Sequence, residues 1–252
     1  MWQSLRNDRL FLVLLAALIA LAWVSLLVWG QSPYGRFLDH EALTDITSED
    51  VNLLVFFVAG WTLIIFAMML PTTLPLIALF RTITSDRSNH MALVGLLATG
   101  YLGVWMAFGV LVHVADLGVH DAEQIGWLDS NNWVIGAGTL MLAGIYQFTP
   151  LKYHCLDKCR SPFSFIAARW HGGNELRQSF QIGLDHSIFC LGYCWSLMLL
   201  MFGVGTGNVG WMLLLGGVMG VEKNMPWGRR LSAPLGFSLI GGGALITILG
   251  IL

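Results

Sequence analysis

Four side chains that can bind metals recur at every fourth position of one apolar stretch: His186, Cys190, Cys194 and Met198. Residues four apart lie on one face of a helix, one turn above another. This face would offer an imidazole, two thiols and a thioether, which suit Cu(I) or another thiophilic ion better than Mg²⁺ or Ca²⁺. An ionisable histidine inside an apolar span is costly, and such a residue is usually kept for a function. Together with the spacing, it predicts a metal site.

Two further thioethers, Met68 and Met69, stand just before Pro71 in an earlier apolar stretch. Proline removes a backbone donor and kinks a helix, which frees carbonyl groups that neighbours must satisfy. We expect this kink at the same membrane depth as the two cysteines, with the methionines facing them. For each cysteine or methionine taken singly the alternative is apolar packing, because both residue types commonly fill cores.

The other two cysteines, Cys155 and Cys159, repeat the four-residue spacing in the longest polar connection, residues 151–180. His154 stands beside the first of them. We expect this connection to be cytoplasmic, where thiols stay reduced and structural disulfides are rare. The pair and its histidine are therefore predicted to form a docking or uptake site for the metal.

The composition indicates a membrane protein. The 252 residues are 56% hydrophobic and only 11% charged, with a mean hydropathy of +0.70. A soluble domain carries roughly 25% charged residues, so the few charges of this chain could not cover a surface that faces water. The net charge is −2 and there are no basic runs, so we expect no nucleic-acid partner. The expected surroundings are the lipid bilayer.

Apolar stretches of roughly 20 residues can each cross a bilayer, and here they predict an all-α bundle of about seven transmembrane helices. We expect a single transmembrane domain over residues 1–252. The expected spans are residues 10–29, 51–80, 91–115, 133–149, 182–202, 209–221 and 234–252.

The distribution of basic residues predicts how the chain is oriented. With a cytoplasmic amino terminus, every Lys and Arg except Arg36 falls on the inner side of these spans, and the outer loops are acidic. Basic residues concentrate on the cytoplasmic side of membrane proteins. We therefore expect a cytoplasmic amino terminus and a multi-pass protein of the cell membrane, of the bacterial inner-membrane type.

Several of these motifs resemble a family described only as predicted metal-binding integral membrane proteins. The matching pieces are AMMLP at residues 67–71, the stretch 146–162, CLGYCWSLM at residues 190–198, and EKNMPWG at residues 222–228. The resemblance implies the multi-pass helical fold and metal binding, without implying a particular reaction. The chain departs from the family pattern at Tyr193, where many members have a further cysteine, and at Gly207, where they tend to have methionine.

Three functions remain open on this pattern, and binding is favoured over catalysis. The first is metal homeostasis, in which the protein transfers, transports or delivers Cu(I) in exchange with a metallochaperone or with subunits of a membrane complex. The second is a membrane thiol–disulfide oxidoreductase that uses both cysteine pairs. The third is a subunit or assembly factor of a respiratory complex. The sequence has no phosphate-binding glycine loop, which excludes an ATPase pump, and no lysine in the last span, which excludes a retinal pump.

Overall fold

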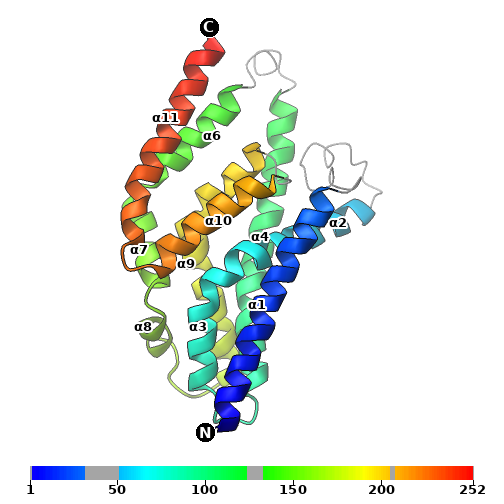
Figure 1. Ribbon diagram of the computed structural model, residues 1–252, viewed down its shortest axis with the longest axis vertical. Helices are drawn as coiled ribbons and strands as arrows, with labels where there is room; N and C mark the ends of the chain where they lie inside the picture. The colour runs from blue at the N-terminus through cyan, green and yellow to red at the C-terminus, as the bar shows by residue number, and fades with distance from the viewer. Residues whose placement is uncertain (1, 32–50, 124–132, 205–207, 252) are drawn as a thin grey trace.

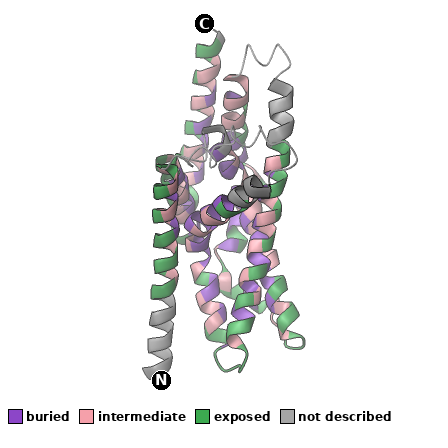
Figure 2. Cartoon of the chain, turned by 90° about the vertical axis from the view of Figure 1, so that its right-hand side faces the viewer, coloured by how far each residue is buried: buried purple, intermediate pink, exposed green. Residues whose placement is uncertain are grey.

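The computed structural model describes residues 2–31, 51–123, 133–204 and 208–251, and the regular structure in these ranges is entirely helical. The predicted all-α fold is therefore confirmed. Figure 1 shows long helices running side by side along the long axis of the molecule, with the amino and carboxyl termini at opposite ends. Buried residues lie mainly where these helices face one another, as Figure 2 shows, and exposed residues cover the outer faces.

Within the part of the chain that the structure describes, five helical segments are long and apolar enough to cross a membrane. They come from α1 (Trp2–Gly30), from α2 (Val51–Ile64) joined to α3 (Leu70–Ile83), from α4 (His90–Glu123), from α9 (Glu175–Val204), and from α11 (Ser232–Ile251) with the turn before it. This number of segments is compatible with a membrane protein.

A sixth segment is broken, because α6 (Trp133–Tyr146) and α7 (Pro150–Cys159) meet at a bend of 66°. The helix in the position of the expected span 209–221 is α10 (Val209–Asn224), whose 16 residues fall short of a full span. The predicted count of seven is therefore not confirmed. Figure 1 shows α10 lying obliquely across the bundle.

The kink expected at Pro71 is present as a π-helical turn, Ile65–Met69, between α2 and α3. Proline has no N–H to donate to the preceding turn, and such turns re-satisfy the backbone around it. The hydroxyl groups of Thr72 and Thr73 both donate to the carbonyl of Met69, at 2.8 and 3.0 Å. These bonds fix the position of Met69 at the bend.

Helices α4 and α9 pack closely because glycine lets their backbones approach each other. A Cβ atom on Gly183 would overlap the carbonyl of Leu97. One turn further along, Ser187 donates to the carbonyl of Tyr101 at 2.8 Å. This close contact brings Tyr101 to the part of α9 that carries the predicted metal-binding residues.

The connection expected over residues 151–180 contains two helices, α7 and α8 (Pro162–Ala167). Helix α7 packs along α9, and α8 packs against α3. Cys155 and Cys159 on α7 are buried within the hydrophobic core. The first part of the connection is thus one of the packed helices of the bundle.

Candidate metal centre

All four cysteines of the chain are free thiols, and they lie in one buried cluster. The cluster forms where α7 packs on α9, so that the two i, i+4 pairs face each other across one helix contact. The sequence suggested two separate sites, one inside the membrane and one in a cytoplasmic connection. The structure places them together.

Cys190 is the centre of this cluster. The side chains of Cys159 and Cys194 both interact with that of Cys190. The Tyr101 hydroxyl is 3.5 Å from its sulfur, and the ammonium group of Lys223 is 3.7 Å from it. A sulfur atom with so many donors around it is well suited to carry negative charge, as it must when it binds a metal.

Cys194 continues the cluster toward the π-helical turn. Its sulfur is 4.0 Å from the thioether sulfur of Met69, and its thiol donates to the carbonyl of Cys190 at 3.0 Å. Met198, one turn further along α9, is fully buried in the same core. Met68 packs instead beside Gly216 of α10, where a Cβ on the glycine would be 3.5 Å from the Met68 methyl group. Of the two adjacent methionines, Met69 is therefore the one placed against a thiol.

The remaining predicted site residues of α7, Cys155 and His154, do not lie at the centre of the cluster. The sulfur of Cys155 packs on the backbone of α9, where a Cβ on Gly192 would be only 2.7 Å from it. His154 is exposed, and its ring contacts the ring of Phe189 with the centroids 6.0 Å apart. The structure thus brings Cys159 to the centre of the cluster, Cys155 to its edge, and His154 to the surface.

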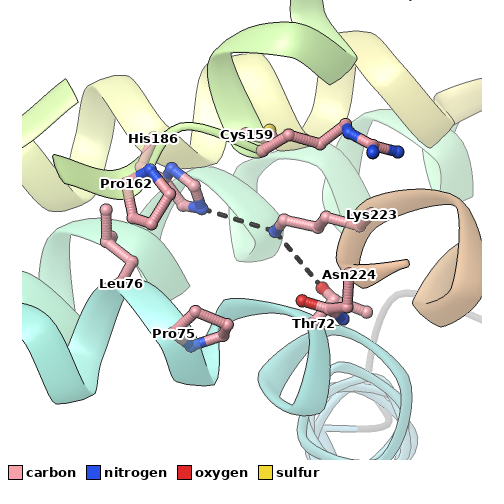
Figure 3. A pocket seen from close by; sticks show the side chains of 9 residues that line it. Thr72, Pro75, Leu76, Cys159, Pro162, His186, Lys223 and Asn224 are labelled. Atoms are coloured by element: carbon pink, nitrogen blue, oxygen red, sulfur yellow. Dashed lines mark hydrogen bonds between the residues drawn. The ribbon is translucent and has the colours of Figure 1, made fainter. Parts of the chain in front are cut away.

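His186 is buried, and it contacts Lys223 directly. Its Nε2 atom is 3.4 Å from the Lys223 ammonium group, which is also 3.3 Å from the Thr72 hydroxyl (Figure 3). An ammonium group can only donate, so Nε2 accepts and the imidazole proton is on Nδ1. Among the described residues, the buried Nδ1 atom of His186 has no hydrogen-bond partner. Lys223 therefore stands between the predicted imidazole ligand and the sulfur of Cys190.

A cavity of about 150 Å³ adjoins this group of residues. Figure 3 shows the Lys223 side chain reaching into it between His186 and Thr72. The exposed side chain of Asn224 forms part of its wall. The residues around it are Thr72, Pro75, Leu76, Cys159, Arg160, Pro162, His186, Lys223 and Asn224. Because Cys159 is one of them, the cavity extends to the edge of the thiol cluster.

A second buried polar group lies next to the cluster and joins four helices. The ammonium group of Lys152 on α7 contacts Glu222 of α10 at 2.8 Å and Ser232 of α11 at 2.9 Å, and it also donates to the side chain of Gln147. The hydroxyl of Tyr193 on α9 donates to the second carboxylate oxygen of Glu222, at 2.6 Å. Tyr193 thus anchors this buried ion pair.

Lys223 and Tyr101 contact the centre of the thiol cluster, yet the sequence did not identify either as a site residue. Lys223 was counted among the basic residues that set the orientation, although only 5% of it is exposed. Its position directly after Glu222 in the EKNMPWG motif was the available signal. The hydroxyl of Tyr101 in an otherwise apolar span was another.

Among the residues that the structure describes, no group of three or more His, Cys, Asp and Glu side chains is arranged to hold a metal ion. The donors that do lie together are thiols and a thioether. Such a set favours a soft ion that needs only a few ligands, because sulfur ligands select Cu(I).

Comparison with known families supports a copper-related protein. The family model described as "PpoB2: Copper chaperone" matches residues 58–246, a range that contains all four cysteines. No curated protein and no solved structure is similar enough to count as a match.

Proposed function

This chain belongs to the PpoB2 copper chaperone family, and we propose that it is an integral membrane protein that takes up Cu(I) on buried thiols and delivers it to another protein. The membrane assignment is supported by the five helical segments of spanning length and by the apolar composition. In this proposal α6 with α7 forms a sixth span, α10 completes the bundle, and the amino terminus is cytoplasmic.

The observation that carries the proposal is a series of neighbouring sulfur side chains. It begins with Cys159 at the cavity, continues to Cys190 and Cys194, and reaches the thioether of Met69. Because these side chains interact in turn, a soft ion can gain a new sulfur ligand before it loses the previous one. This is how a carrier can hold Cu(I) firmly and still release it.

In the proposed cycle Cu(I) arrives through the cavity and is first bound by Cys159. It then moves to Cys190 and Cys194, whose thiol protons leave as the metal binds, because only the thiolate is a ligand. Met69 and Met198 supply neutral thioether ligands on the side of the cysteine pair away from the cavity. Neither Cys155, which packs on Gly192, nor the exposed His154 lies on this route. Both residues lie beside it.

The proposal is tested by the metal content of the purified protein. Full-length protein in detergent, loaded with Cu(I) without oxygen and then desalted, is expected to retain about one Cu(I) per chain. The variant with Cys190→Ser and Cys194→Ser is expected to retain none. The single variant Cys155→Ser, which also removes a buried thiol, is the matched control and is expected to retain the metal. Unchanged copper in the double variant would contradict the proposal.

A vesicle experiment distinguishes delivery of Cu(I) to another molecule from transport of Cu(I) across the membrane. The protein is reconstituted into lipid vesicles that enclose a Cu(I) chelator, and Cu(I) is supplied outside. A chaperone is expected to bind Cu(I) and pass it to a chelator added outside, without accumulation inside. Accumulation that requires Cys190 and Cys194 would instead identify a transporter.

A further inference from the structure

Lys223 is a buried cation, and among its hydrogen-bond partners in the described part of the chain only one group can carry negative charge. Its ammonium group contacts the Thr72 hydroxyl at 3.3 Å, the Nε2 atom of His186 at 3.4 Å and the sulfur of Cys190 at 3.7 Å. The hydroxyl and the imidazole nitrogen are neutral acceptors here. Among the described residues, the group that can serve as the negative partner of Lys223 is therefore the sulfur of Cys190.

The acidic groups near this end of the bundle already have partners of their own. Glu222, the neighbour of Lys223 in the chain, is paired with Lys152 at 2.8 Å. Asp185, the neighbour of His186, is paired with Arg169 at 2.7 Å. Among the described residues, Lys223 itself takes part in no ion pair with a carboxylate.

The other cation at the cavity is also accounted for. Arg160 donates to the backbone carbonyls of Glu222 and Met225, at 2.5 and 2.8 Å, and to that of Pro226 at 3.0 Å. These bonds hold the guanidinium group over the carboxyl end of α10. Of the two Lys and Arg side chains that line the cavity, Lys223 is thus the one that faces the thiols.

We propose that Lys223 makes the thiol site selective for monovalent over divalent metal ions by acting as the fixed counter-ion of the metal–thiolate group. This inference rests on the proposed function. Two thiolates that hold Cu(I) carry one negative charge in total, and Lys223 brings the buried group to neutrality. Two thiolates that hold a divalent ion such as Zn²⁺ are already neutral, and the charge of Lys223 is then left without a partner.

The selectivity follows from burial. A charge without a partner is costly in a medium of low dielectric constant, whereas an ammonium beside an anionic group is stabilised there. With 5% of its surface exposed, Lys223 has little access to water that could screen it. The ligand atoms alone would not exclude Zn²⁺, because cysteine thiolates bind zinc well. The charge of Lys223 supplies the discrimination that the sulfur atoms lack.

The test compares a monovalent and a divalent probe, Ag(I) and Cd²⁺, both of which bind thiolates and are not readily oxidised or reduced. Affinities of full-length protein in detergent are measured by competition with chelators of known strength. Lys223→Leu removes the charge and adds no sulfur ligand beside the thiols. The ratio of the Ag(I) affinity to the Cd²⁺ affinity is expected to fall by at least about tenfold, which corresponds to about 1.4 kcal/mol.

Lys223→Arg is the matched control, since it keeps the positive charge, and it is expected to stay close to the original ratio. Lys223→Gln provides a second neutral variant if the leucine variant does not fold. A ratio that is unchanged in a folded neutral variant that still binds Ag(I) would overturn the inference. Failure of the unaltered protein to bind Ag(I) at all would instead refute the proposed function.

Discussion

The thioether sulfur of Met69 lies 4.0 Å from the thiol of Cys194, although the two residues are 125 positions apart in the chain. The contact joins the π-helical turn after α2 to the middle of α9. It depends on the bend before Pro71, where Thr72 and Thr73 hold the carbonyl of Met69. A regular helix through this region would have placed the methionine differently, so the local backbone irregularity is what adds a thioether to the thiol cluster.

Met69→Leu is expected to weaken Cu(I) binding by about tenfold, because leucine fills the same space without offering a sulfur ligand. Affinity is measured by competition with a Cu(I) chelator. The matched control is Met68→Leu, since Met68 packs beside Gly216 of α10. The control is expected to bind Cu(I) as the unaltered protein does. Equal losses in the two variants would remove Met69 from the proposed ligand set.

Cys159→Ser is expected to slow the loading of Cu(I) by about tenfold or more and to change the amount finally bound much less. The reason is that Cys159 lines the cavity and contacts Cys190, whereas Cys190 and Cys194 retain their own thiols. Loading is followed by rapid mixing with a coloured Cu(I) complex. Cys155→Ser controls for the loss of a buried thiol on the same helix, and it is expected to load at the original rate. If both variants load normally, Cu(I) does not arrive through Cys159.

Glu222→Gln is expected to destabilise the protein strongly, by about 3–5 kcal/mol, because it leaves Lys152 as a buried charge without its counter-ion. Both side chains of this pair are fully buried. The change is measured as a lower midpoint of thermal unfolding in detergent. Asp157→Asn is the comparison, since Asp157 pairs with Arg229 at the surface, where an ion pair contributes about 0–1 kcal/mol. Similar midpoints for the two variants would show that the buried pair is not important for stability.

Gly183→Ala is expected to force α4 and α9 apart, because the added methyl group would overlap the carbonyl of Leu97. Overpacking of this kind costs about 1–3 kcal/mol. Gly103→Ala, at a position of α4 with open space, is the control and is expected to be neutral. Thermal unfolding measures the first effect. The same shift moves Tyr101 away from Cys190, so Cu(I) affinity is expected to fall in Gly183→Ala alone. An unchanged unfolding midpoint in this variant would contradict the close packing.

The sequence by itself determined the helical class and the pairing of ligands along each helix. Apolar composition and helical periodicity are local properties, so they place Cys190 above His186 and Cys159 above Cys155 whatever the rest of the chain does. The same reasoning located a break in the helix at Pro71, since a missing backbone donor acts within a few residues. The number of membrane spans was harder to predict from the sequence. The short length of α10 and the bend between α6 and α7 depend on how these helices pack against their neighbours.

Only the tertiary structure decided which of these ligands meet. Packing of α7 on α9 and of α3 against α10 depends on contacts between distant parts of the chain, and no local pattern encodes them. These contacts bring Cys159 to Cys190, turn Met69 toward Cys194, and leave His154 at the surface. They also bury Lys152 and Lys223, two charges that look like ordinary loop residues in the sequence. A charge can remain inside a bundle only where other helices supply its partners, and those partners are known only when the helices are assembled.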